Sequence, residues 1–460
     1  MTFTDLPFLF GFLPIVLILY LFVHKIRMAN LFILIASLIF YAWGGLQSLI
    51  ILVLVLLWNY CGAKIIDQSE DEKIRKQLLI AVIAIDVLVL FFYRYLGVWF
   101  GFLSTTLSRL PSLMPVGLSF YLFSCLSCVI DVYRKDCPAP ASFVDFGVYA
   151  AFFGRVNMGP IGHYAKFEEQ LKHHKTSRKK TGEGWTLFMQ GLFRKVLLAD
   201  NFGLVYAALA GNTTWMGNLL FGFAYFFQLY FDFSGYSRMA RGLGEMFGFT
   251  IPENFHLPYA ALSVQDFWRR WHISLTDWFR NYIYIPLGGN RVSHQRWMMN
   301  VMIVWLLTGL WHGATWPFLV WGLYQGGLIL AEHAFLNQFM EKMPAALRHV
   351  YLILTQLIGW TFFSSATLSS GLQTIGRYFG MGISGFADAG AWFVWGGAIV
   401  LLLVAILLSS GLSKWISTWL HSRMGRKYWI LSIVGWVIVF VLCLSCLVSA
   451  TAQTFLYAVF

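Results

Sequence analysis

Long runs of apolar residues, separated by short charged segments, recur from one end of the chain to the other. A helix needs about 20 predominantly apolar residues to cross a bilayer, so runs that reach or approach this length predict membrane-embedded helices. Such runs cover residues 7–23, 31–41, 49–61, 78–95, 113–130, 202–230, 351–363, 392–408 and 429–448. They are continuous rather than alternating in ten-residue segments, which excludes a membrane β-barrel. The pattern predicts an all-α polytopic membrane protein with a single membrane domain over residues 1–460.

One apolar segment, residues 143–161, is interrupted by Gly154-Arg155 and Gly159-Pro160. It lies between two basic stretches, 134–135 and 166–180, and both favour the cytoplasm under the positive-inside rule. If both stretches lie on the same side, the segment between them crosses the membrane an even number of times. The simplest even number is zero. We therefore expect a re-entrant or interfacial element, whose irregular backbone must be shielded by protein or by a wet cavity.

Residues 252–296 regain charge but keep their aromatic residues. Phe267, Trp268, Trp271 and Leu275 recur at helical spacing, which predicts an amphipathic helix in the headgroup layer on the cytoplasmic side. The following sequence, Ile-Pro-Leu-Gly-Gly-Asn, predicts a turn.

The core stretch, residues 297–333, places His312 between two strongly apolar segments. An ionisable side chain near mid-bilayer is costly, so it is a candidate functional residue; the alternative is a neutral histidine bonded to a carbonyl of a neighbouring helix. If the segment is helical, residues three, four or seven positions away share the face of His312. These residues are Trp305, Thr308, Thr315 and Trp316. A face with one base, two hydroxyls and two indoles suits a narrow polar tunnel.

Composition and charge support a membrane protein. Hydrophobic residues make up 58% of the chain and charged residues 12%, values that a soluble chain rarely approaches. The formal net charge of +12 arises from 33 basic and 21 acidic residues, and the basic residues fall mainly between the apolar runs. The positive-inside rule and contact with anionic lipid account for this charge, so we expect the lipid bilayer as a partner and no nucleic acid.

Two Cys-Leu-Ser-Cys pairs occur, Cys125/Cys128 and Cys443/Cys446. Paired CxxC motifs often indicate zinc or redox chemistry. Both pairs lie inside apolar segments, where a free cysteine behaves as a small hydrophobic residue. We therefore expect no metal site.

The chain lacks the nucleophile elbow, the phosphate-binding loop, the zinc-protease motif and the kinase motifs. What remains is a histidine able to act as a general base, taking a proton from a hydroxyl group as its oxygen attacks an activated acyl group. His312 is the first candidate. His272 either assists from the cytoplasmic mouth of the tunnel or is a structural residue near two tryptophans, and both interpretations stay open.

Several sequence motifs, spread along almost the whole chain, resemble those of a known protein family. The weaker blocks are residues 37–44, 115–120, 130–134, 191–201 and 230–237. The strongest blocks are Asp-Phe-Trp-Arg-Arg-Trp-His-Ile-Ser-Leu at 266–275, Tyr-Ile-Pro-Leu-Gly-Gly-Asn-Arg at 284–291 and Thr-Gly-Leu-Trp-His-Gly-Ala at 308–314. Together they resemble the membrane-bound O-acyltransferase (MBOAT) superfamily, within it the bacterial alginate O-acetylase branch.

The resemblance implies a helical ring with re-entrant elements around a central tunnel in the inner membrane of a bacterial cell, crossed several times. The invariant histidine of the family corresponds to His312 and the second histidine to His272. The implied reaction takes an acetyl group from a cytoplasmic donor, acetyl-CoA or another acyl thioester, for O-acetylation of an exported, alginate-like polysaccharide. No permanently bound cofactor is implied, but periplasmic or extracellular acetyltransferase partner proteins are.

Further residues are candidates for contact with substrate or tunnel. They are Trp268, Arg269, Arg270, Trp271, Asn281, Tyr284, Trp305, Thr308, Trp311 and Trp316. Arg269, Arg270, Arg280 and Arg291 are also candidates for the phosphates of the donor, because a guanidinium binds phosphate through two hydrogen bonds. For any single arginine, the alternative is contact with lipid phosphate.

The sequence departs from the family pattern at four places. Arg238 and Asn281 stand where the family usually has aspartate, 364–366 reads Ser-Ser-Ala where Arg-Ala is common, and 154–160 is looser than the usual Val-Ala-Gly-Pro. The acceptor therefore stays open, with D-alanyl transfer to teichoic acid and acyl transfer to peptidoglycan or cellulose as alternatives. A glycan transporter or flippase is the non-enzymatic alternative, although transporters often contain repeated halves and this sequence shows no convincing repeat.

Overall fold

A computed structural model describes residues 1–449, 455 and 456, and helices form nearly all of its regular structure. The α-helices are α1 (Leu13–Tyr20), α2 (Ile26–Ala42), α3 (Leu46–Gln68), α4 (Glu72–Phe91), α5 (Gly97–Phe100), α6 (Thr105–Ser108), α7 (Leu118–Arg134), α8 (Phe143–Ala151), α9 (Tyr164–His173), α10 (Arg178–Phe193), α11 (Asp200–Ala208), α12 (Trp215–Met246), α13 (Val264–Arg270), α14 (Ile273–Phe279), α15 (His294–His312), α16 (Trp316–Ala331), α17 (Asn337–Met340), α18 (Ala345–Ser364), α19 (Leu368–Tyr378), α20 (Ala389–Ser409), α21 (Leu412–Met424) and α22 (Arg426–Val448). The π-helical turns are η1 (Phe8–Phe12), η2 (Phe92–Leu96), η5 (Arg194–Ala199), η7 (Arg280–Tyr284) and η8 (Glu332–Leu336), and the 3₁₀ turns are η3 (Gly101–Leu103), η4 (Leu110–Leu113) and η6 (Pro258–Ala260). In this part of the chain the only strand-like pairing is a single bridge between Phe255 and Trp271.

Four helical segments are long and apolar enough to cross a membrane: Leu46–Gln68, Glu72–Leu103, Ala389–Ser409 and Lys427–Val448. Their outer faces are strongly apolar. On α20, for example, Phe393 is 83% exposed and Val400 is 67% exposed. Apolar surface of this extent is stable in lipid rather than in water. The prediction of an all-α membrane protein is confirmed.

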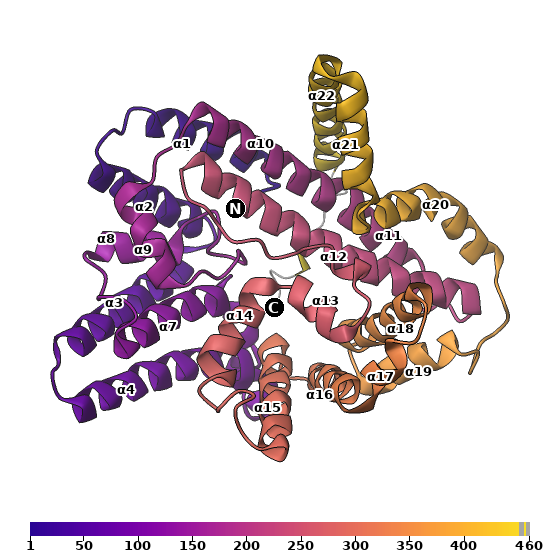
Figure 1. Cartoon of the computed structure of the whole chain (residues 1–460), viewed down its shortest axis with the longest axis horizontal. Helices are drawn as coiled ribbons and strands as arrows, with labels where there is room; N and C mark the ends of the chain where they lie inside the picture. Colours follow the sequence, from indigo (N-terminus) through magenta and orange to yellow (C-terminus); the bar gives the residue numbers. More distant parts are fainter. Residues whose placement is uncertain (450–454, 457–460) are drawn as a thin grey trace.

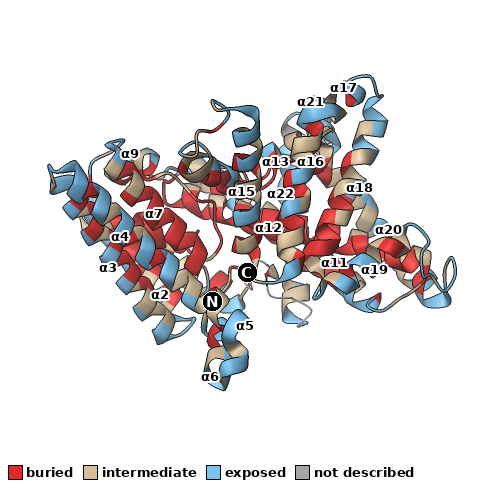
Figure 2. Cartoon of the chain, turned by 90° about the horizontal axis from the view of Figure 1, so that it is seen from below, coloured by how far each residue is buried: buried red, intermediate tan, exposed pale blue. Residues whose placement is uncertain are grey.

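The helix α12 forms the buried centre of the molecule, with α10 packed along it (Figure 1). Gly184 and Gly191 on α10 face Gly242 and Gly235 on α12, and this pairing lets the two backbones approach closely. Figure 2 shows buried residues concentrated along α7 and α12 and exposed residues on the peripheral helices. The packing around α12 provides the rigid core against which the central helices α13–α16 are placed.

The apolar run 202–230, expected to be continuous, is broken between α11 and α12. Gly211 has φ = 80°, and the side chain of Thr214 accepts a hydrogen bond from the backbone N–H of Gly217 at 3.2 Å. A left-handed glycine followed by a threonine N-cap ends one helix and begins the next. The hydrophobic run alone did not reveal this turn.

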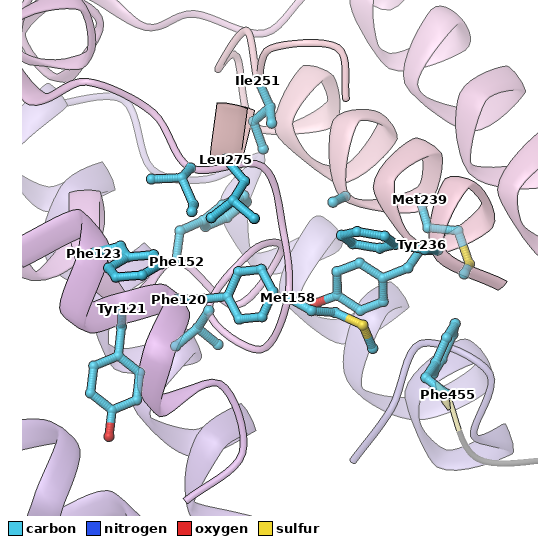
Figure 3. Packing of buried hydrophobic residues seen from close by; sticks show 14 of the residues in the cluster. Phe120, Tyr121, Phe123, Phe152, Met158, Tyr236, Met239, Ile251, Leu275 and Phe455 are labelled. Carbon is cyan, nitrogen blue, oxygen red and sulfur yellow. The ribbon is translucent and has the colours of Figure 1, made fainter. Parts of the chain in front are cut away.

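The interrupted segment 143–161 has the irregular, shielded backbone expected of it. Helix α8 ends at Ala151, and the chain then runs as a loop through the protein interior, where Phe152 and Phe153 are fully buried. In Figure 3, Met158 of this loop lies beside Tyr236 of α12, while Phe120 of α7 lies nearby. The loop therefore fills the space between α7 and α12.

Candidate active site

His312 is the last residue of α15. The helix stops there because Gly313 is extended (φ = 175°), and a side chain on Gly313 would collide with the ring of Phe318. Helix α16 then runs back against α15, and Gly309 and Gly322 lie at the closest approach of the two backbones. The bend places His312 at the inner end of a tightly packed antiparallel helix pair.

His312 is buried, and its surroundings are aromatic. Only 3% of the residue is exposed, and its ring lies 4.8 Å from the ring of Phe363 and 5.0 Å from that of Trp321, measured between centroids. Its backbone carbonyl accepts a hydrogen bond from Nη2 of Arg94 at 2.6 Å. Arg94 thus satisfies one of the carbonyl groups that a helix leaves open at its C-terminus.

The predicted amphipathic helix over 267–275 is wrong in two respects. Two short helices, α13 and α14, replace it, because Trp271 is extended (φ = −104°) and His272 is left-handed (φ = 45°). Backbone hydrogen bonds to an extended segment compensate for the break: His256 N–H donates to Arg270 O at 3.0 Å and Ile273 N–H donates to Asn254 O at 3.1 Å. The four apolar residues of the pattern are buried inside the protein rather than facing lipid, because a helix packed on a core shows the same spacing.

Asn254 fixes the ring of His272. Its Oδ1 accepts hydrogen bonds from the backbone N–H of Ser274 at 3.0 Å and from the Ser274 hydroxyl at 2.9 Å, and it lies 3.2 Å from Nδ1 of His272. Because an amide oxygen only accepts, His272 donates from Nδ1, and Nε2 is its basic nitrogen. Burial lowers the pKa of His272 well below its usual value near 6.5, so the ring is neutral at neutral pH.

The core stretch also holds α13 in place. The carboxylate of Glu332 accepts hydrogen bonds from the backbone N–H groups of Val264 at 2.6 Å and Gln265 at 2.9 Å. The indole of Trp268 donates to Oε1 of Gln325 on α16 at 3.1 Å. An acidic side chain at a helix N-terminus satisfies open N–H groups and complements the helix dipole. These contacts tie the segment of His272 to the segment of His312.

Both histidines line one cavity of about 350 Å³. Its other lining residues are Gln265, Trp268, Arg269, Trp271, Leu275, Thr276, Phe279, Arg280, Tyr284, Val304, Trp305, Thr308, Trp321 and Ile329. Arg269, Thr276 and Arg280 are exposed, whereas the two histidines are buried. The cavity therefore leads from a cationic, polar mouth to an aromatic interior that contains both imidazole rings.

Most of the predicted site residues line this cavity: His272, His312, Trp268, Arg269, Trp271, Tyr284, Trp305 and Thr308. The prediction that Thr315 and Trp316 share the face of His312 is wrong, because α15 ends at His312, and Trp316 is 72% exposed on the next helix. Trp311 packs beside the cavity, with its ring 4.6 Å from that of His312 and 6.2 Å from that of His272.

Two further candidates have other partners. Arg270 pairs with Asp266 at 2.9 Å. Asn281 lies near His163, at 3.3 Å between Nδ2 and Nε2, and its carbonyl accepts a hydrogen bond from Arg134 at 3.1 Å. Neither residue lines the cavity of the histidines.

Sequence reasoning missed Asn254, Arg94, Trp321 and Phe363 as residues of this site. Asn254 and Arg94 act through hydrogen bonds to His272 and to the carbonyl of His312, and both come from distant segments. Trp321 was visible as a tryptophan of the core stretch, but only the turn after His312 brings it to the ring. No local signal marks the other three.

Within the described residues, no group of three or more His, Cys, Asp or Glu side chains is arranged to hold a metal ion. Cys125 and Cys128 are buried on α7, and Cys443 is buried on α22. The lining of the histidine cavity itself offers imidazole, hydroxyl, indole and guanidinium groups.

The amino-acid sequence that builds this site is similar to those of known proteins. Residues 138–372, which include both histidines, match the model of the membrane-bound O-acyltransferase family, MBOAT. The "Probable alginate O-acetylase AlgI" of Azotobacter vinelandii is 38% identical over 83% of this chain and 79% of its own length. The "Peptidoglycan O-acetyltransferase" of Helicobacter pylori is 32% identical over 80% and 78%, respectively. The "Teichoic acid D-alanyltransferase" of Bacillus subtilis is 29% identical over 41% and 51%.

Proposed function

Because the chain belongs to the membrane-bound O-acyltransferase family, we propose that it transfers an acetyl group from a cytoplasmic thioester to hydroxyl groups of an exported, alginate-like polysaccharide, with His312 as general base. The relatives that cover most of the chain carry acetyl transfer in their names, with alginate or peptidoglycan as the acceptor. The D-alanyl-transferring relative matches less than half of the chain. An acetyl group and a glycan acceptor are therefore favoured over D-alanine and teichoic acid.

The observation that carries the proposal is the shared cavity of His272 and His312. A general base must reach the proton that it removes, and a thioester must be kept from water, which would compete as a nucleophile. The cavity gives a substrate hydroxyl a way to the imidazole of His312. The buried aromatic side chains around His312 would keep water away from the thioester. A transporter does not require an imidazole at the inner end of such a cavity.

In the proposed reaction, an acceptor hydroxyl oxygen attacks the thioester carbonyl carbon while the imidazole of His312 takes the hydroxyl proton. The carbon–sulfur bond then breaks and the leaving thiolate takes the proton back from the imidazolium, which regenerates neutral His312 and releases a thiol. Proton transfer of this kind contributes about 10²–10⁴-fold to the rate. His272, neutral and held through Nδ1 by Asn254, presents Nε2 as its basic nitrogen and either assists this transfer or fixes the turn between α13 and α14.

Acetyl-CoA is the donor that we propose. Arg269 and Arg280 are exposed at the mouth of the cavity, where guanidinium groups can bind its phosphates. The basic loops between the apolar segments favour the cytoplasm, so the mouth lies on the donor side of a multi-pass protein in the inner membrane of a bacterial cell. The acetyl group is destined for the polysaccharide, which accepts it directly or through a periplasmic partner protein that completes the transfer.

The proposal is tested with the full chain, purified in detergent, mixed with radiolabelled acetyl-CoA and short mannuronate oligosaccharides. We expect label on the oligosaccharide, as an alkali-labile ester. Reconstitution into vesicles with donor on one side and acceptor on the other tests the direction of transfer. Transport of unmodified oligosaccharide across the vesicle membrane, without acetyl transfer in either arrangement, contradicts the proposal and supports the flippase alternative.

A further inference from the structure

One side of the mouth of the histidine cavity is formed by α14 and by the π-helical turn η7 that follows it. Four residues of this segment line the cavity: Thr276, Phe279, Arg280 and Tyr284. Tyr282, in the middle of η7, does not line the cavity and is only 8% exposed. None of the reaction steps described above uses Tyr282. Its contacts on the other side of η7 therefore bear on where the mouth residues lie.

The hydroxyl group of Tyr282 lies in a chain of hydrogen bonds between two other segments. It donates to Oδ1 of Asp131, near the end of α7, at 2.7 Å. Nδ1 of His163, the residue before α9, lies 2.9 Å from the same hydroxyl oxygen. Because the hydroxyl proton is given to Asp131, the oxygen accepts and His163 donates from Nδ1. Asp131 is only 5% exposed, and a buried carboxylate is costly unless it accepts hydrogen bonds of this kind.

Asn281 supports the same arrangement from the neighbouring position of η7. With its proton on Nδ1, His163 offers Nε2 as an acceptor, and Nδ2 of Asn281 lies 3.3 Å from this atom. The backbone carbonyl of Asn281 accepts a hydrogen bond from Arg134 of α7 at 3.1 Å. Two consecutive residues thus attach η7 to α7 and to the start of α9.

The same face of α7 also holds α14. The indole of Trp278 donates from Nε1 to the carbonyl of Phe123 at 3.1 Å, and Nε1 lies 3.0 Å from Oγ of Ser127. The rings of Trp278 and Phe123 are stacked, with 4.1 Å between their centroids. Phe123, Ser127 and Asp131 are four residues apart, so they follow one face of α7. The two elements therefore meet along a seam in which Tyr282 is a buried anchor of η7.

We propose that Tyr282 is a positioning residue for acetyl transfer. Its hydrogen bonds to Asp131 and His163 hold η7 in place, and this turn presents the residues of the cavity mouth. The inference rests on the proposed function, in which Arg280 binds a phosphate of the donor. Loss of the Tyr282 hydroxyl group should leave proton transfer intact and weaken donor binding. In kinetic terms, the KM for acetyl-CoA rises while kcat is retained.

Tyr282→Phe tests this role, because it removes the hydroxyl group and keeps the ring. We expect the KM for acetyl-CoA to rise about tenfold, the weight of a hydrogen bond to a charged group, with kcat unchanged. Tyr20→Phe is the matched control. The hydroxyl group of Tyr20 is also buried, donates to the carbonyl of Phe247 at 3.2 Å and lies 3.1 Å from Nδ1 of His174, but Tyr20 is not part of the cavity. Tyr20→Phe should lower the thermal unfolding temperature to a similar extent and leave the KM unchanged.

The acceptor of the chain is tested with two substitutions of Asp131. Asp131→Leu removes the acceptor and should raise the KM for acetyl-CoA as Tyr282→Phe does. Asp131→Asn keeps an accepting oxygen and should restore a KM closer to that of the unmodified chain. Equal KM values for the two folded variants would show that the hydrogen bond to Asp131 does not hold the turn.

Backbone hydrogen exchange tests the positioning without donor or acyl transfer. We expect faster exchange over residues 276–285 in Tyr282→Phe than in the unmodified chain and in Tyr20→Phe, because the segment opens more readily when its anchor is lost. This result in a chain that transfers no acetyl group supports the positioning and counts against the proposed function alone. Equal exchange in the three proteins overturns the proposal. An unchanged KM in folded Tyr282→Phe, or an equal rise in Tyr20→Phe, also overturns it.

Discussion

The two histidines of the cavity are held in opposite ways. His312 ends a regular helix, so its position follows from helical geometry and from the close packing of α15 on α16. His272 sits in a break between two short helices, in a left-handed conformation, and is fixed by Asn254 from another segment. One ring is placed by a rigid element and the other by a hydrogen-bonded turn. We therefore expect acyl transfer to depend on the imidazole group of His312. For His272, we expect it to depend on the residue that holds the ring, Asn254.

The largest effect is expected from His312→Gln. Glutamine keeps a polar side chain of similar reach but cannot take a proton, so acetyl transfer should fall by about 10²–10⁴-fold. The measurement is the initial rate of acetyl ester formation, with thermal unfolding of the solubilised protein as the control for folding. A rate within a factor of two of the unmodified chain would remove His312 from the base role.

The next largest effect is expected at the turn between α13 and α14, which contains His272. Asn254→Leu removes the acceptor shared by His272 and Ser274, and each buried donor left without a partner costs about 1–3 kcal/mol. We expect a lower free energy of unfolding in detergent and slower transfer. Asn254→Asp, which keeps the accepting oxygen, should lose less stability; equal losses in the two variants would show that the shared acceptor is not what holds the turn.

A smaller effect is expected from a change in the packing of α15 on α16, which positions His312. A methyl group at Gly322 would press against the backbone of Trp305 and Gly309, and overpacking of this kind costs about 1–3 kcal/mol. Gly322→Ala should therefore destabilise the protein and slow transfer by displacing His312. Gly327→Ala, on the same helix with open space around it, should not destabilise. If the two variants unfold alike, close packing of α15 on α16 does not position the histidine.

The smallest effect is expected at Trp316, which is exposed beyond the end of α15. Trp316→Ala should change the free energy of unfolding by no more than about 0.5 kcal/mol and leave the transfer rate unchanged, as substitutions at exposed positions usually do. A large loss of rate on this substitution would return Trp316 to the site.

Helical spacing correctly placed Trp305 and Thr308 on the cavity of His312, because α15 is regular over these residues. It failed for Trp316, since periodicity does not show where a helix ends. It also failed at Trp271-His272: the apolar spacing continued through a break that depends on hydrogen bonds to residues 254–256. The family resemblance, carried by motifs along most of the chain, predicted the fold class, which is confirmed. It also singled out both histidines, which line one cavity, while their catalytic roles stay a prediction.

Contacts between distant segments were beyond the reach of a single sequence. Arg94 reaches the carbonyl of His312 from more than two hundred residues away, and Phe363 packs on its ring from α18. The hydrogen bonds of Tyr282 with Asp131 and His163 likewise join three separate segments. Such features emerge from tertiary packing, which local patterns do not encode.

The central claim, that His312 removes a proton during acyl transfer, is tested most directly by chemical rescue. The single-turnover rate of acetyl transfer is measured for His312→Ala with and without added imidazole, beside the unmodified chain. The account predicts a rate reduced by about 10²–10⁴-fold that rises with imidazole concentration, because the free base enters the space left by the side chain. Transfer by His312→Ala at the unmodified rate, without imidazole, would contradict it.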